Sequence, residues 1–224
     1  MDKLAHLQRL LGYTFKDPAL LQLALTHRSA SGTNNERLEF LGDSILNHVI
    51  AEALFQRLPK AREGDLSRLR ASLVKGDTLA EIGRELQLGE YLRLGQGERK
   101  SGGHQRGSII ADVLEAVTGA ILLDAGVDAC RECLLRWFDS RLQGLQPGTV
   151  RKDHKTRLQE FLQGRGMALP AYELVAVKGE DHNQQFHIQC VLPAPAGAFP
   201  GSGSSRRKAE QAAAQAALEA LSNV

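Results

Sequence analysis

The stretch Asn35-Glu36-Arg37-Leu38-Glu39-Phe40-Leu41-Gly42-Asp43 decides how the first half of this chain folds. Its acidic residues, Glu36, Glu39 and Asp43, follow one another at intervals of three and four residues. Each residue of an α-helix advances by about 100°, so the three carboxylates fall within an arc of roughly 60°. The opposite face carries apolar residues, which is typical of a helix that packs on a core. These residues are Leu38, Leu41, Ile45 and Val49.

Like charges at this spacing repel one another, by roughly a few tenths of a kcal/mol per pair on an exposed helix. A divalent cation would offset the repulsion, whereas a solvated acidic face needs no ligand, and the three acids alone do not decide between these interpretations. Gly42 favours the cation slightly. Glycine costs up to about 1 kcal/mol in a helix interior, and it allows another backbone or a ligand to come close.

A second acidic pair lies in the apolar stretch from Ser108 to Asp124, where Asp112 and Glu115 are three residues apart. Burying two carboxylates is costly unless they pair with cations or bind a metal, and this stretch contains no Arg or Lys. If its helix crosses the first one, the carboxylates form an all-oxygen site of the kind that Mg²⁺ or Mn²⁺ prefers. The predicted metal ligands are Glu39, Asp43, Asp112 and Glu115.

Both acidic stretches resemble motifs of the bacterial ribonuclease III family. Residues 35–43 are similar to the signature of that family, and Ala111-Asp112-Val113-Leu114-Glu115-Ala116 is similar to its second acidic motif. The resemblance covers nearly the whole chain, because the C-terminal part is similar to a double-stranded-RNA-binding domain. It implies a Mg²⁺-dependent endoribonuclease, with Mn²⁺ as an alternative ion. Such an enzyme cuts double-stranded RNA and leaves 5′-phosphate and 3′-hydroxyl ends with short 3′ overhangs.

The resemblance also implies catalytic roles, partners and substrates. Asp43 and Glu115 are expected to carry most of the catalysis, while Glu36 and Glu63 orient water, metal or RNA from the rim of the site. Glu63 has a structural interpretation as well, because an acidic residue stabilises a helix N-terminus. The family implies a homodimer in which two acidic clusters face one duplex. Its expected substrates are ribosomal RNA precursors and structured messenger RNAs.

The first half of the chain is predicted to be all helix, in seven or eight segments. His27 lies between two of these helices and has two interpretations, a catalytic histidine or a structural, hydrogen-bonding one, and we favour the second. Residues 95–107 are expected to form a loop, which is not a nucleotide-binding P-loop because no strand precedes it and the Gly-Lys-Ser/Thr ending is missing. Its basic residues have two equal interpretations, contact with a phosphate backbone or a mobile surface loop; they are Arg99, Lys100 and Arg106. The principal helices are expected over 1–11, 17–25, 36–58, from Asp65, over 77–86, from Ser108, and over 127–142.

The C-terminal part has a different pattern, with an α-β-β-β-α order. Residues 172–178 and 185–192 alternate apolar and polar side chains, as half-buried strands do. Helices are expected over 155–164 and from Ser204 to Leu221, with a short strand or turn over 199–203. We therefore predict a multidomain chain. It comprises an all-α endonuclease domain over 1–143, a Pro/Gly-containing linker over 144–152, and a small α+β domain over 153–224.

The last helix begins with Arg206, Arg207 and Lys208. Cations in a first turn oppose the helix dipole, and together with the free N–H groups they favour a phosphate site. A merely soluble helix face is the weaker alternative interpretation. In the family that the chain resembles, the first helix and the first strand–strand loop of this domain touch RNA minor grooves. By position, this implies four further RNA-binding residues, Thr156, Gln159, Gln163 and His182. For Thr156, Gln159 and Gln163, an ordinary polar helix face is the alternative interpretation.

Composition sets limits on these predictions. The net charge is +2 over 224 residues, so RNA affinity depends on where the charges lie rather than on bulk charge. No segment has the length of a transmembrane helix, and residues 1–11 are amphipathic rather than a signal peptide. Three cysteines, an odd number, fit a reducing cytoplasm. Cys130 and Cys133 are interpreted as core thiols, although their spacing also occurs in zinc and redox sites.

Two other functions share parts of this pattern. A double-stranded-RNA-binding protein without cleavage activity would need only the C-terminal domain, yet all six acidic residues of the predicted site are present. A metal nuclease that acts on DNA would need the acidic residues, but a domain that reads 2′-hydroxyl groups argues against it.

Overall fold

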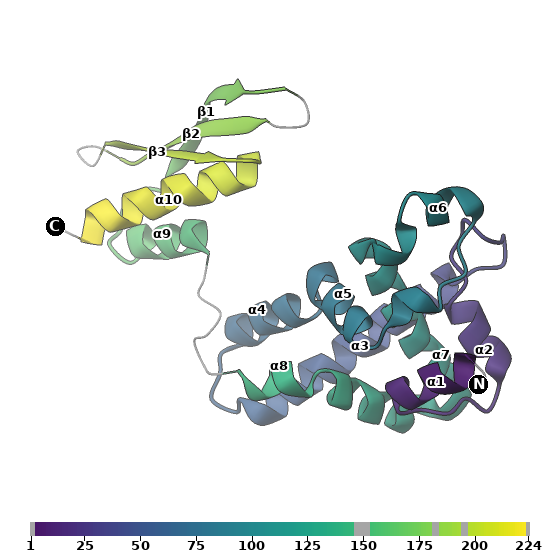
Figure 1. Cartoon of the computed structure of the whole chain (residues 1–224). Coiled ribbons are helices and arrows are strands. Elements are labelled where there is room, and N and C mark those ends of the chain that lie inside the picture. The colour runs from purple at the N-terminus through teal and green to yellow at the C-terminus, as the bar shows by residue number, and fades with distance from the viewer. Residues whose placement is uncertain (1–2, 146–152, 181–183, 194–196, 223–224) are drawn as a thin grey trace. The chain divides into compact units, whose positions relative to one another are not determined.

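The computed structural model describes residues 3–145, 153–180, 184–193 and 197–222. The chain divides into two compact units, Met1–Val150 and Arg151–Val224. Within the described residues the first unit consists of helices, and the second has a three-stranded sheet and two helices (Figure 1). The predicted fold class, an all-α domain followed by an α+β domain, is confirmed. Most of the predicted linker, 146–152, lies outside the described residues.

The first unit is built around two long helices that pack along each other, α3 and α7. The shorter helices cover them, and α2 begins where the sequence predicts, because Asp17 Oδ1 accepts a hydrogen bond of 2.9 Å from the backbone N–H of Ala19. The helices are α1 (Lys3–Leu11), α2 (Pro18–Ala24), α3 (Glu36–Arg57), α4 (Glu63–Leu73), α5 (Gly76–Glu85), η1 (Leu88–Glu90), α6 (Gln96–Lys100), η2 (Gly103–Gln105), α7 (Gly107–Trp137) and α8 (Asp139–Gln143).

Three predictions about the secondary structure of the first unit are wrong. Helix α4 begins at Glu63 rather than Asp65, because acidic residues in a first turn favour the helix N-terminus. The expected loop over 95–107 contains α6 and η2, and the ion pair between Glu98 and Arg106 holds these two turns together at 2.8 Å. The helix expected over 127–142 is instead the end of α7 followed by α8, and Gly126, with φ +83°, kinks α7 near the expected break.

Glycines set the distance between α3 and α7. A Cβ atom on Gly42 would lie 1.7 Å from the carbonyl oxygen of Glu115, and one on Gly119 would lie 2.2 Å from that of Leu38. Neither position has room for a side chain, so the two backbones touch here. The prediction that Gly42 admits a second backbone is confirmed. Of the expected apolar face of α3, Leu38 and Val49 are buried while Leu41 and Ile45 are half-buried.

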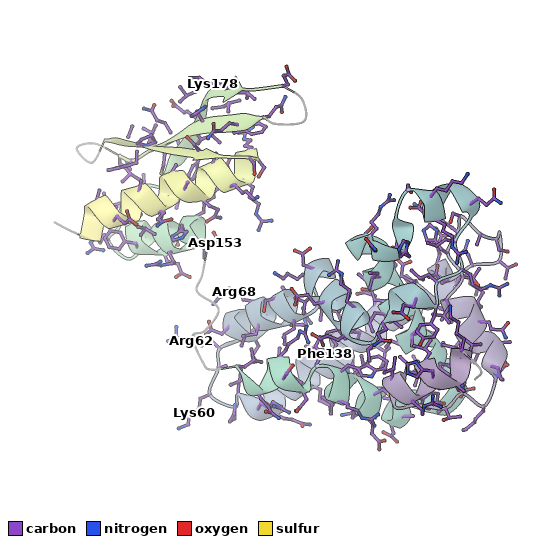
Figure 2. The ribbon with its side chains drawn as sticks, in the orientation of Figure 1. Lys60, Arg62, Arg68, Phe138, Asp153 and Lys178 are labelled. Atoms are coloured by element: carbon purple, nitrogen blue, oxygen red, sulfur yellow. The ribbon has the colours of Figure 1, made fainter. Side chains whose placement is uncertain are left out.

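The interior of the first unit is apolar and extends to the end of α7, where Phe138 is fully buried (Figure 2). Cys130 and Cys133 are free, buried thiols in this core, as predicted. Burial raises the pKa of both thiols, which makes them poor nucleophiles and poor metal ligands at neutral pH. Among the helices that the structure describes, none combines the length and apolarity needed to cross a membrane.

The second unit is a small antiparallel sheet of order β1-β2-β3, with β1 (Ala171–Lys178), β2 (Gln185–Val191) and β3 (Ala198–Gly203). Helices α9 (His154–Gln163) and α10 (Arg206–Ser222) pack on each other, and α10 packs on the sheet. Asp153, labelled in Figure 2, joins the two helices: its carboxylate accepts from the N–H of Thr156 at 3.1 Å and from Gln211 Nε2 at 2.8 Å. Gly201 lets α10 come close, since a Cβ there would lie 2.1 Å from the Ala213 nitrogen.

Candidate metal centre and RNA-binding residues

The contact between Gly42 and Gly119 brings acidic side chains of α3 and α7 together. One carboxylate oxygen from each of Glu39, Asp112 and Glu115 lies within 4.8 Å of the others, and all three residues are half-buried. Each of the three was predicted as a metal ligand. Three close carboxylate oxygens, partly shielded from water, form the ligand set that hard divalent cations prefer. The residues present therefore fit a divalent metal.

The electrostatics of this cluster favour a bound cation. Burial raises the pKa of Glu115 to about 8, and the charges of Asp43, Glu39 and Asp112 add to the effect. Burial and then the charge of Asp112 raise the pKa of Glu39. Burial also raises the pKa of Asp112, against the opposing charges of His27 and Arg28. Each carboxylate is thus destabilised in its ionised form, and a bound cation would reverse this.

Asp43, the fourth predicted ligand, lies beside this cluster without belonging to the set of mutually close oxygens. Its side chain is exposed, and Oδ1 accepts a hydrogen bond of 2.8 Å from Asn47 Nδ2 on the next turn of α3. It is near enough for its charge to raise the pKa of Glu115. Glu36 is also exposed, with its Oε1 3.4 Å from Arg28 Nη1, and its charge raises the pKa of Glu39.

Glu63 is placed differently from the other predicted acids. It is the first residue of α4, and its Oε1 accepts a hydrogen bond of 2.7 Å from Ser67 Oγ in the same helix. Among the described residues, no contact joins it to Glu39, Asp112 or Glu115. The structural interpretation of Glu63, as an acidic residue at a helix N-terminus, agrees with this position. Its role at the cleft stays a prediction.

A polar pocket of about 490 Å³ adjoins the acidic cluster, and Glu39 and Asp112 form part of its wall. Three basic residues, His27, Arg28 and Arg106, line it as well. The sequence favours a structural role for His27 and gives no signal that places Arg28 in a site. The backbone beside His27 is held by a short parallel bridge between Thr26 and Arg93, and no local sequence pattern signals such a pairing.

The predicted RNA-binding residues of the second unit lie on two helices. Gln159 and Gln163 are exposed on α9, whereas the Thr156 hydroxyl donates to Asp153 at 2.8 Å. Arg206, Arg207 and Lys208 are exposed in the first turn of α10. Two of these cations have weak local partners, Glu210 at 3.1 Å from Arg206 and Ser204 at 3.2 Å from Lys208. His182 lies outside the described residues.

Comparisons with known proteins agree with both units. A family model described as Ribonuclease-III-like matches residues 17–142, and a model of the Double-stranded RNA binding motif matches residues 154–221. The chain is 62% identical to Ribonuclease 3 of Hahella chejuensis over 219 residues, which cover 98% of this chain and 97% of that protein.

Solved structures give the same result for the first unit. The crystal structure of the nuclease domain of ribonuclease III from Campylobacter jejuni is 42% identical, with a TM-score of 0.62, and the match covers 65% of this chain and 100% of that one. A second solved structure of that domain is described as showing structural flexibility in a region involved in dimer formation. It is 44% identical with a TM-score of 0.61, and the match covers 62% of this chain and 97% of that one.

The matches account for each part of the site. The nuclease-domain match contains the acidic cluster of α3 and α7, and the RNA-binding motif contains α9, the sheet and α10. The Hahella relative shares both parts in one chain of nearly the same length. The chain therefore belongs to the ribonuclease III family, and it is a double-strand-specific endoribonuclease with a C-terminal double-stranded-RNA-binding domain.

Proposed function

We propose that Glu39, Asp112 and Glu115 hold Mg²⁺, with Asp43 completing the site directly or through water. The observation that carries this proposal is the approach of three carboxylate oxygens to within 4.8 Å where α3 crosses α7. Mn²⁺ prefers similar oxygen ligands and substitutes for Mg²⁺. When bound, the ion supplies a low-pKa water and offsets negative charge on the phosphate.

The acidic residues of the protein have separate roles in catalysis. Glu115 is the most strongly destabilised anion of the cluster, with its pKa raised to about 8, so it gains most from a bound cation. Asp43 and Glu115 are the residues on which catalysis chiefly depends. Glu36, paired with Arg28 at the edge of the pocket, orients water or RNA from the rim. Glu63 takes the same part from α4, in its own site or in that of a partner subunit.

The C-terminal domain binds the RNA duplex. The exposed cations Arg206, Arg207 and Lys208 contact phosphates, while Thr156, Gln159, Gln163 and His182 contact minor grooves. Cutting both strands leaves 5′-phosphate and 3′-hydroxyl ends with short 3′ overhangs. The natural substrates are ribosomal RNA precursors and structured messenger RNAs. The enzyme acts in the cytoplasm. Its nuclease domain spans residues 1–143, and its RNA-binding domain spans residues 153–224.

We also propose that the chain forms a homodimer through the apolar face around Phe40. The Phe40 side chain is 78% exposed and Leu123 is 58% exposed. Both line a hollow of about 1020 Å³ together with Leu20, Leu23 and Leu41. Large exposed apolar side chains around a hollow indicate a protein interface. The Campylobacter nuclease domain, described as having a region involved in dimer formation, supports this proposal.

The proposed function is tested with matched RNA and DNA duplexes of one sequence, each incubated with Mg²⁺ or with excess chelator. We expect Mg²⁺-dependent cutting of the RNA duplex, with the DNA duplex intact. Equal cutting of DNA would indicate a general metal nuclease. A shifted but uncut RNA duplex in both conditions would indicate a binding protein without cleavage activity.

A further inference from the structure

The pocket next to the acidic cluster has an unusual charge distribution. Its wall contains four carboxylates, those of Glu36, Glu39, Glu98 and Asp112, together with the basic residues His27, Arg28 and Arg106. His27 and Arg28 lie close enough to Asp112 to oppose, electrostatically, the rise in its pKa. Arg28 and Arg106 each pair with one of these carboxylates, Glu36 and Glu98. Basic residues beside a metal site also suit an RNA phosphate, because its oxygens are negatively charged.

The hydrogen bonds of His27 fix which nitrogen carries the ring proton. The backbone N–H of Ser29 donates to His27 Nδ1 at 3.2 Å. A backbone N–H can only donate, so Nδ1 is the acceptor and the proton lies on Nε2. The Ser29 hydroxyl lies 2.8 Å from the same nitrogen. It accepts from the N–H of Gly95 at 3.0 Å, and its own proton is therefore free to point at Nδ1.

The segment that carries His27 is held in place by backbone contacts. The N–H of His27 donates to the carbonyl of Arg93 at 3.1 Å, and the N–H of Arg93 donates to the carbonyl of Leu25 at 2.9 Å. At the end of the segment, the side chain of the buried Asn35 donates to the carbonyl of Ala24 at 3.2 Å. The imidazole is thus fixed before any ligand arrives, and a fixed donor loses little entropy on binding.

The other ring nitrogen is available to a ligand. Within the part of the chain that the structure describes, His27 Nε2 makes no hydrogen bond, although the ring lines the pocket. Arg28 and Arg106 are each paired with a single carboxylate, at 3.4 Å to Glu36 and at 2.8 Å to Glu98. Each guanidinium has five N–H donors, so both retain donors for an additional anion.

We propose that this pocket is a binding site for an RNA phosphate group at the point of cleavage. His27 donates its Nε2 proton to a non-bridging oxygen, and Arg28 and Arg106 offset the phosphate charge. His27 then has two separate roles, with Nδ1 holding the segment and Nε2 holding the substrate. The proposal rests on the metal centre proposed above, since the pocket shares Glu39 and Asp112 with it.

Two substitutions separate the roles of the two His27 nitrogens. In His27→Asn, the amide reaches the position of Nδ1 and can accept from Ser29, but nothing replaces the Nε2 donor. In His27→Gln, the longer amide reaches the position of Nε2 and can donate into the pocket, but it no longer accepts from Ser29. A hydrogen bond to a charged group changes binding by about ten- to a hundredfold. We expect His27→Asn to lower kcat/KM for a short RNA duplex by that factor, and His27→Gln to retain most of it.

Thermal unfolding supplies the control, because a structural role predicts the opposite order. Without the hydrogen bond from Ser29, His27→Gln should have a lower Tm than His27→Asn. The two variants thus rank one way in stability and the other way in cleavage. If His27→Asn cuts as well as the unaltered protein, or if His27→Gln loses as much activity as His27→Asn, the phosphate contact is refuted.

Duplex binding is measured separately, in a Glu115→Gln background that prevents cutting. There we expect His27→Asn to raise the Kd for a short RNA duplex, and His27→Gln to leave it nearly unchanged. An equal Kd for both would contradict the proposal. If Glu115→Gln itself still cuts, the proposed metal centre fails, whereas the comparison of the two His27 variants in the unaltered protein remains decisive for the phosphate contact.

Discussion

Gly42 of α3 and Gly119 of α7 face each other at the point where the two helices touch, and each has a backbone atom of the other helix where its Cβ would be. The Gly42 position is filled by the carbonyl of Glu115, a member of the acidic cluster. The spacing of the carboxylates is therefore set by the backbones themselves. Glycine is required here for the close approach of two helices rather than for a turn.

The contact between Gly42 and Gly119 predicts that a Gly-to-Ala substitution here destabilises the protein, whereas in an open helix the same substitution stabilises it. Alanine is favoured over glycine in a helix by about 1 kcal/mol, yet Gly119→Ala should destabilise the protein by about 3 kcal/mol or more, because a methyl group must push the backbones apart. Urea unfolding measures this change. Gly97→Ala in α6 is the control, since a Cβ there meets nothing within 4 Å. A Gly119→Ala protein as stable as Gly97→Ala would show that the helices are not in contact.

The raised pKa of Glu115 predicts how the metal-free protein responds to pH. Its carboxyl has a pKa of about 8 in the folded protein and an ordinary value of 4.5. Between these values the folded state binds more protons than the unfolded state, so the free energy of unfolding falls as the pH rises from about 4.5 to about 8. Urea unfolding with a chelator, repeated across this window, measures the slope. Glu115→Gln cannot ionise and should flatten it, and an unchanged slope in that variant would contradict the assignment.

The proposed dimer is tested with two phenylalanines of one helix. Phe40 and Phe55 both belong to α3, with side chains that are 78% and 71% exposed. We expect Phe40→Ser to shift the protein toward the monomer in sedimentation velocity, because it removes a large apolar side chain from the hollow lined by Leu123. Phe55→Ser changes an equally exposed side chain elsewhere and should leave a dimer. Identical sedimentation of both variants would count against this interface.

The cations at the start of α10 predict a salt-dependent effect on RNA binding. Replacing Arg207 and Lys208 by Ala should weaken duplex binding and reduce the slope of log K against log salt by about 0.9 for each phosphate that is no longer neutralised. The control variant, with Arg9 and Lys16 replaced by Ala, removes the same charge from exposed positions in the first unit. If both double variants bind alike, with equal slopes, the α10 cluster does not contact phosphate.

Several of these features could be read from the sequence because their cause is local. Asp112 and Glu115 are acidic residues in an otherwise apolar stretch. Gly42 lies inside a helix, where Ala is ordinarily favoured over Gly. The bounds of α3 follow from its amphipathic pattern and from Pro59. These patterns depend on neighbours within one or two turns, so they predict elements and the faces that meet.

Other features depend on contacts between distant residues. The loop expected over 95–107 forms α6 and η2 because Arg106 reaches back to Glu98. The backbone of His27 is held by the pairing of its segment with Arg93, and neither segment indicates the other in the sequence. The side chain of Asp43 lies outside the close group of oxygens because Asn47 binds it, and helix periodicity alone does not predict which of two neighbouring acids turns inward.

We propose that the carboxylates of α3 and α7 are needed for cutting RNA and not for holding it. The most direct measurement compares the unaltered protein with Glu115→Gln on one long RNA duplex in Mg²⁺, with cleavage and binding followed in parallel. We predict that Glu115→Gln binds the duplex as tightly as the unaltered protein and leaves it uncut. Normal cutting by Glu115→Gln would contradict the claim.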